Sequence, residues 1–265
     1  MSSPAVVLPA AGALTRRRNQ FHSYASAALL LIVIAGFSPT LFARGAFFAV
    51  PPIPSYLFAH GFVLTGWFAW LLVQARLAGS GRLALHRKLG TAGALYAVAV
   101  AAGALMATMG VVRRVVGLGI RLDADISALG QPGLGQNLSV LNFLAAVVWM
   151  NIGSVVAFAV LVALAVALRR RPEAHKRLML LASVAIIGPA LARISRWPGL
   201  GGEQGPFVLS ALLVLFAAIV ANDLWTRRRP HPATVFGIAF ILSTNSVAGR
   251  IAATELGLTF VRGLS

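Results

Sequence analysis

The chain has 265 residues, of which 58% are hydrophobic and only 11% are charged, and its mean hydropathy is +0.84. Soluble domains carry about 25% charged residues, so this composition excludes an ordinary soluble protein and indicates an integral membrane protein. The basic residues behind the formal net charge of +17 cluster at the ends of apolar segments, which favours anionic lipid head groups rather than nucleic acid as partners. The absence of cysteine excludes disulfides, thiolate metal sites and covalent c-type haem attachment.

The N-terminal segment is polar and rich in Pro and Ala, and the basic cluster Arg16–Arg18 lies close to its end. A secretory signal places its positive charge before a short apolar core, whereas here a short apolar stretch precedes the charge and a full span follows it. We therefore expect a disordered, uncleaved cytoplasmic tail over residues 1–22 and a single transmembrane helical domain over residues 23–265.

A helix needs about 20 apolar residues to cross ~30 Å of hydrocarbon. Seven segments of the chain meet this requirement, which predicts an all-α, polytopic transmembrane helix bundle of about seven spans. The fifth span is the least regular, because Pro189, Arg193 and Arg196 crowd its end. The predicted spans lie at roughly Tyr24–Phe42, Tyr56–Arg76, Leu89–Val112, Leu138–Leu168, Leu178–Ser195, Phe207–Trp225 and Thr234–Ala253.

Arginine and lysine are dense in every second gap between these spans, and this alternation predicts the orientation. Fifteen positive residues fall in one set of gaps and eight in the other, so the positive-inside rule places the denser set in the cytoplasm. The amino terminus is therefore expected inside and the carboxyl terminus outside. The longest outer gap, Arg113–Asn137, is expected to fold over a site as a lid or as a short surface helix.

Four of the five histidines precede a span that runs outward: His22, His86, His175 and His231. The phrases HRKL and HKRL, which begin at His86 and His175, are nearly identical and lie at the same expected depth. Two facing imidazoles can ligate a b-type haem, and His is also a ligand for transition metals. His86 and His175 are therefore the candidate haem or metal ligands. The alternative is that these side chains lie among lipid head groups, and this interpretation is favoured for all four histidines, most of all for His22 and His231.

A second candidate site lies on the outer side. His60 falls just inside the second span, where a polar group in hydrocarbon is costly and indicates function. Arg193 and Arg196 are three residues apart on one helix face, an arrangement that can hold an anionic head group, a haem propionate or a carboxylated substrate. Asn151 and Arg250 are expected to join them in one ligand pocket. The alternatives are a packing role for His60 and arginines that extend to the outer phosphates.

The letters HG from His60, Q at Gln74 and HRKLG from His86 form a pattern that resembles a group of uncharacterised bacterial membrane proteins. The later phrases HKRLMLLA and NDLWTRRRPHPAT are similar to that group as well, so the resemblance extends to about Val235. Because the group has no known function, the resemblance implies only a multi-pass protein of the bacterial inner membrane. It also indicates that four residues are worth testing: His60, Gln74, His86 and His175. A looser similarity to multi-spanning b-type cytochromes and oxidase-assembly proteins rests on the histidines alone.

Three functional hypotheses follow. The first is an integral inner-membrane protein that binds haem b or a transition metal through histidines at the membrane edge. The second is binding or transport of a small anionic or lipidic molecule through the outward-facing His/Arg pocket. The third is a scaffold or assembly partner without a ligand. The motifs do not decide between an enzyme, a transporter and a scaffold.

Overall fold

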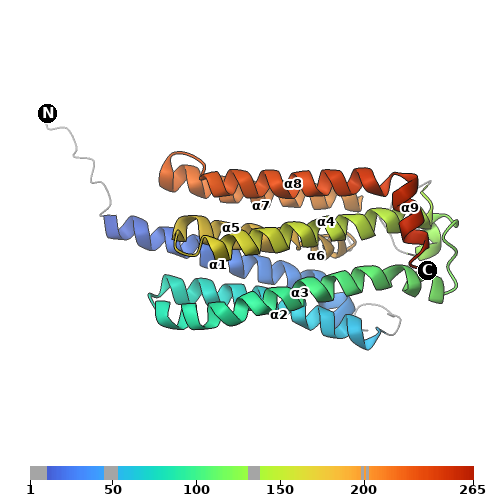
Figure 1. Ribbon diagram of the computed structural model, residues 1–265, viewed down its shortest axis with the longest axis horizontal. Helices are drawn as coiled ribbons and strands as arrows, with labels where there is room; N and C mark the ends of the chain where they lie inside the picture. Colours follow the sequence, from blue (N-terminus) through green and yellow to red (C-terminus); the bar gives the residue numbers. More distant parts are fainter. Residues whose placement is uncertain (1–10, 45–52, 131–137, 198–199, 201–202) are drawn as a thin grey trace.

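The computed structural model describes residues 11–44, 53–130, 138–197, 200 and 203–265, with side chains described from residue 20 onward. Regular structure in these ranges is helical, apart from an isolated β-bridge between Asp125 and Ser139. The long helices lie side by side along one common direction, and a short helix crosses one end of the bundle (Figure 1). The all-α bundle that the apolar segments predict is confirmed.

The elements are α1 (Ala11–Phe37), the π-helical turn η1 (Ser38–Phe42), α2 (Ser55–Gly79), α3 (Leu83–Gly117), the 3-10 turn η2 (Ile126–Leu129), α4 (Val140–Ala167), α5 (Pro172–Ala185), α6 (Gly188–Ile194), α7 (Gln204–Arg227), α8 (Pro232–Ala252) and α9 (Glu255–Arg262).

Six of these helices are long and apolar enough to cross a membrane: α1 from Gln20 onward, α2, α3, α4, α7 and α8. A seventh crossing is obtained when α5 and α6 are counted as one span, which is bent by 49° at the break between them. In Figure 1 α5 begins near the end opposite to α9 and α6 continues along the bundle toward α9, and α1 also begins at the end opposite to α9. The chain is therefore a multi-pass membrane protein with six to seven crossings.

The break in the fifth span follows from Pro189, which lacks the N–H that would continue the α-helical ladder. The backbone instead makes a tighter turn, in which Ile187 N donates to Val184 O at 3.3 Å. Helix α1 packs closely against α6 just beyond the break, because a Cβ added at Gly36 would lie 2.4 Å from the carbonyl oxygen of Ala190. The bent segment is therefore held against the bundle by backbone contact.

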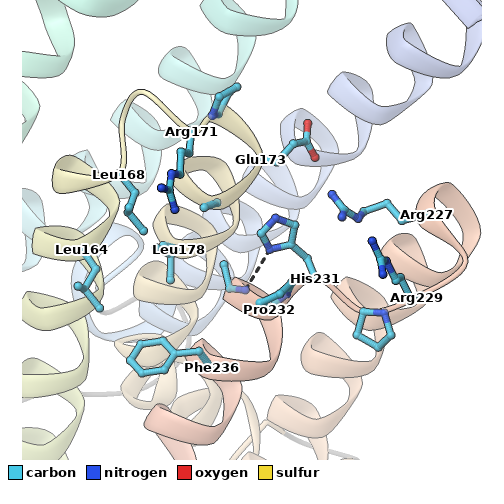
Figure 2. A pocket seen from close by; sticks show the side chains of 14 residues that line it. Leu164, Leu168, Arg171, Glu173, Leu178, Arg227, Arg229, His231, Pro232 and Phe236 are labelled. Atoms are coloured by element: carbon cyan, nitrogen blue, oxygen red, sulfur yellow. Dashed lines mark hydrogen bonds between the residues drawn. The ribbon is translucent and has the colours of Figure 1, made fainter.

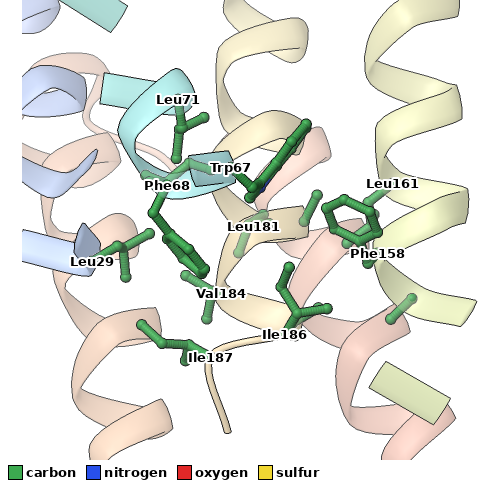
Figure 3. Close-up of a cluster of buried hydrophobic side chains, with 14 of the residues drawn as sticks. Leu29, Trp67, Phe68, Leu71, Phe158, Leu161, Leu181, Val184, Ile186 and Ile187 are labelled. Carbon is green, nitrogen blue, oxygen red and sulfur yellow. The ribbon is translucent and has the colours of Figure 1, made fainter. Parts of the chain in front are cut away.

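The hydrophobic core lies where α1, α2, α4 and α5 meet (Figure 3). Trp67 and Phe68 of α2 and Phe158 of α4 are almost completely buried, and the rings of Trp67 and Phe158 meet edge to face with centroids 5.1 Å apart. The Trp67 indole N–H donates to Ser183 Oγ of α5 at 3.0 Å, so the only polar atom of the Trp side chain is satisfied. This bond fixes α2 against the bent span.

Several boundaries differ from the predicted ones. Helix α3 extends beyond the predicted Leu89–Val112 at both ends, and at the N-terminal end the added residues are mostly good helix formers. Helix α1 begins at Ala11, so the helix already covers the second half of the segment 1–22 that is predicted to be a disordered tail. Residues 1–10 of that segment lie outside the described residues. The short surface helix expected in the gap 113–137 corresponds to η2, although residues 131–137 are not described.

Candidate functional site

The structure brings two of the predicted ligands together. His86 lies in the first turn of α3 and His175 in the first turn of α5, and their imidazole ring centroids are 6.2 Å apart at an interplanar angle of 84°. A metal bound by both rings would lie about 2 Å from each nitrogen, which places the nitrogens about 4 Å apart and the ring centres about 6 Å apart. The observed centroid separation is close to this value, the two rings meet edge to face, and both side chains are half-buried.

Each imidazole is oriented by a neighbouring helix through its Nδ1 atom. His175 Nδ1 lies 2.8 Å from the carbonyl oxygen of Ala165 on α4. A carbonyl only accepts, so Nδ1 carries the proton, and Nε2 of the neutral ring keeps a lone pair for a metal. A metal-bound histidine usually donates a hydrogen bond to a backbone carbonyl from the ring nitrogen that does not bind the metal.

Gln74 of α2 plays the corresponding part for the other ring. His86 Nδ1 lies 3.3 Å from the main-chain oxygen of Gln74, and the side-chain amide of the same residue lies against this nitrogen as well. With the amide nitrogen toward the ring, it donates to Nδ1 at 2.6 Å, and the amide oxygen accepts from Gly90 N at 3.2 Å. With the amide oxygen toward the ring, Nδ1 donates and Nε2 is the free ligand. The orientation of Gln74 therefore selects the tautomer of His86.

The other two histidines of the predicted ring are placed differently. His231 caps α8, because its Nδ1 accepts from Ala233 N at 3.0 Å. His22 is buried on α1 and meets the ring of Phe21 edge to face. Among the residues that the structure describes, no group of three or more His, Asp or Glu is placed to hold a metal ion. The His86–His175 pair thus offers two protein ligands.

An ion-pair network that sequence reasoning missed lies at the same end of the bundle. Arg177 of α5 is 1% exposed and Asp223 of α7 is 0% exposed, and both Nε and Nη2 of the arginine donate to Asp223 Oδ1. The other carboxylate oxygen accepts from Thr234 Oγ1 at 2.6 Å and from His231 N at 3.0 Å. Arg177 Nη1 also contacts the Glu173 carboxylate at 2.7 Å. Asp223 of α7 thus joins α5 and α8 to its own helix.

The outer site is partly assembled. His60 of α2 faces α3, where a Cβ added at Gly103 would lie 3.5 Å from the His60 Nδ1 atom. Arg193 of α6 is close enough to His60, Arg114 and Arg196 to interact with them electrostatically. Its Nη1 donates to Pro189 O at 2.8 Å, and its guanidinium lies 4.4 Å from the centroid of the Phe37 ring. The result is a cluster of basic groups within the outer half of the bundle.

Two buried nitrogens of this cluster, His60 Nδ1 and Arg193 Nε, have no hydrogen-bond partner. The remaining members of the predicted pocket lie elsewhere. Arg250 is exposed on α8, and Asn151 is half-buried on α4, which packs against α8 through Gly153. No described contact joins these two residues to His60 or Arg193. The predicted five-residue pocket is thus represented by His60, Arg193 and Arg196.

Two open pockets lie at opposite ends of the bundle, and neither is lined by His60 or Arg193. The first, of about 890 Å³, lies between the α4–α5 connection and the α7–α8 turn at the arginine-rich end (Figure 2). The second, of about 740 Å³, lies between the α3–α4 connection and α9, where Asp123 and Arg262 are among its lining residues. The long outer connection therefore borders a pocket, as expected of a lid, but not the predicted one.

Comparisons of the chain with protein-family models, with curated protein sequences and with solved structures found no match.

Proposed function

We propose that this multi-pass membrane protein binds a b-type haem through His86 and His175 at the arginine-rich end of the bundle. The observation that supports this is the pair of nearly perpendicular imidazoles whose centres are 6.2 Å apart. Two protein ligands suffice for haem, whose ring supplies the four other donors, whereas structural zinc requires four donors and catalytic zinc three from the protein. Haem therefore fits the pair better than a bare metal ion does.

His86 and His175 would hold the haem from this chain, and the chemistry that it would supply here is one-electron transfer. The residues of this chain orient the ligands and tune them. Ala165 O fixes the ring of His175, and Gln74 controls which nitrogen of His86 carries the proton. The half-buried position at the membrane edge allows exchange of electrons with a partner outside the bilayer.

A visible absorption spectrum of the purified protein, with haem extraction, tests the proposal. We expect a Soret band and sharp reduced α and β bands, which His86→Ala and His175→Ala should abolish. The matched control is His231→Asn, which changes a histidine at the same end of the bundle, keeps a capping side chain and should retain the spectrum. A colourless wild-type protein that has been expressed with haem precursors would contradict the proposal.

Gln74→Glu provides a finer test, because a carboxylate only accepts and so holds the proton of His86 on Nδ1. We expect the variant to retain haem and to have a lower reduction potential, since the ligand becomes more basic. Gln74→Leu should weaken haem retention. Equal potentials and equal haem content in all three proteins would show that Gln74 does not orient a ligand.

A second candidate function is the binding of a small anion on the outer side. The observation that favours it is the cluster of His60, Arg193 and Arg196, in which His60 Nδ1 and Arg193 Nε are buried without a hydrogen-bond partner. Acetate or inorganic phosphate should raise the thermal stability of the protein in detergent, and Arg193→Gln should remove this effect. Arg250→Gln, which changes an exposed arginine, should leave it intact. A protein without haem that also fails to respond to either anion would favour the scaffold hypothesis.

A further inference from the structure

The pocket at the arginine-rich end has two chemically different walls (Figure 2). The apolar wall is formed by α4, α5 and α8, through Leu164, Leu168, Leu178 and Phe236. The basic wall faces it and is formed by Arg227 and Arg229, with His231 between the two walls, while Arg171 lies beside Leu168 at the edge of the apolar wall. A pocket of this kind matches a molecule with an anionic end and an apolar end.

The charge of the basic wall is not neutralised by the acid beside it. Glu173 lines the pocket, but its carboxylate already pairs with Lys176 at 2.8 Å and with Arg177 at 2.7 Å. None of the ion pairs described in residues 20–44, 53–130, 138–197 and 203–265 includes Arg171, Arg227 or Arg229. The Nε atom of Arg227 is also buried without a hydrogen-bond partner. The wall therefore retains positive charge and unused donors.

His231 contributes a further donor. Its Nδ1 accepts from Ala233 N, so the proton of the neutral ring is on Nε2. Burial, and then the charges of Arg177 and Arg227, lower the pKa of His231 and keep the ring neutral near pH 7. The position of this ring is fixed from the other side as well, because His231 N donates to the buried carboxylate of Asp223 at 3.0 Å.

We infer that this pocket binds an anionic phospholipid of the adjacent leaflet, with its phosphate against Arg227 and Arg229 and an acyl chain along Leu164, Leu168 and Phe236. A zwitterionic lipid would bring a second positive charge to the basic wall, and a soluble anion would leave the apolar wall in contact with water. The combination of both walls at the membrane edge selects an anionic lipid. This site is separate from the His86–His175 pair and does not depend on haem.

Native mass spectrometry of the full-length protein in detergent tests the inference. Phosphatidylglycerol and phosphatidylcholine with the same acyl chains are titrated in parallel, and phosphatidylglycerol should bind more tightly. Arg227→Gln combined with Arg229→Gln should weaken phosphatidylglycerol binding about tenfold, as expected for the loss of charge-assisted hydrogen bonds. The matched control is Arg87→Gln, which removes an exposed positive charge outside the pocket and should leave the affinity unchanged.

Two further measurements test the inference: competition by a soluble anion, and removal of an apolar side chain from the pocket. Glycerol phosphate, which carries the head-group charge without acyl chains, should not displace the lipid at millimolar concentration. Phe236→Ala should weaken lipid binding while all charges are retained. Equal affinity for the two lipids, an equal loss in Arg87→Gln, or displacement by glycerol phosphate would each overturn the inference. The last result would assign the pocket to a soluble anion.

Discussion

At the scale of single residues, the buried pair of Arg177 and Asp223 is the most consequential interaction. Both side chains are almost completely removed from solvent, and every described polar contact of Asp223 goes to a group on α5, on α8 or at its N-cap. Desolvation of two charges roughly offsets their attraction, so the pair contributes little compared with a well-packed apolar pair. Removal of one partner, however, leaves a charge without compensation in the interior.

We expect Asp223→Leu to lower the free energy of unfolding by about 3–5 kcal/mol, because Arg177 is then left buried with only Glu173 to neutralise it. The double variant Arg177→Met, Asp223→Leu should regain most of this loss. The control is Asp123→Asn, which breaks the pair with Arg121 and should cost less than about 1 kcal/mol because both side chains are exposed. Denaturant titrations in micelles measure all three, and a neutral Asp223→Leu would contradict the buried network.

His231 gives a prediction for pH. Burial lowers the pKa of His231 below its ordinary value of 6.5, so the unfolded chain binds a proton more readily than the folded protein does. The resulting stabilisation is complete above pH 6.5 and is lost as the pH falls through the lowered pKa. His231→Asn retains an N-cap and does not titrate. The stability of the wild type relative to this variant should therefore decrease on acidification from pH 7 to 5, and a pH-independent difference would be inconsistent with a neutral cap.

At the scale of elements, the contact between α1 and α6 explains why a bent span is tolerated. Glycine at position 36 permits the two backbones to approach, and close approach provides the dispersion contacts that hold helices together in lipid. The carbonyls freed near Pro189 thereby lie inside the bundle rather than against hydrocarbon, where unsatisfied groups are costly.

Gly36→Ala should cost about 1–3 kcal/mol, because the new methyl group meets the backbone of Ala190 and neither helix can yield locally. The control is Gly249→Ala on α8, where nothing lies within 4 Å of an added Cβ. That substitution should be neutral or stabilise the protein by up to about 1 kcal/mol through helix propensity. Thermal unfolding in detergent distinguishes the two, and equal midpoints would show that α1 and α6 are not in close contact.

Helix α9 shows what apolar runs alone could not predict. Leu256 and Phe260 are 77% and 41% exposed, whereas Gly257 and Val261 are buried. Trp149 of α4 fixes the helix, because its indole N–H donates to Gly257 O at 3.3 Å. The segment is too short to span a membrane, so the predicted spans end at Ala253. An amphipathic helix of this kind lies at the membrane surface with its apolar side chains in the interface.

At the scale of the whole molecule, the bundle has two ends of different charge density. The α4–α5 connection lies at the arginine-rich end and α9 at the other (Figure 1). A reporter fused after Arg171 should therefore read cytoplasmic, and one fused after Ser265 should read periplasmic. If both reporters gave the same side, the bent pair α5 and α6 would be a re-entrant loop rather than a span, and six crossings would remain.

The spans were predictable because each is a local property of about 20 consecutive residues. Contacts between helices were not, since they depend on which faces meet. Arg177 and Asp223 are 46 residues apart in the chain, and no local sequence pattern predicts that they form an ion pair. The sequence predicts His86 and His175 as a pair because both begin nearly the same motif and both precede a span at the same expected membrane depth. Asn151 and Arg250 satisfy the same depth criterion as His60, but α4 and α8 direct them elsewhere.

The Arg177–Asp223 pair also constrains how the protein is made. The fifth span carries the buried Arg177 side chain into the bundle, and on the same helix only Glu173 pairs with it. The compensating carboxylate is synthesised later, in α7, and its last hydrogen-bond partner later still, in α8. The nascent chain therefore cannot insert α5, α7 and α8 into their final positions one at a time. These three helices are expected to leave the translocon as a group, so that biogenesis has a single late step after the first four spans are in place.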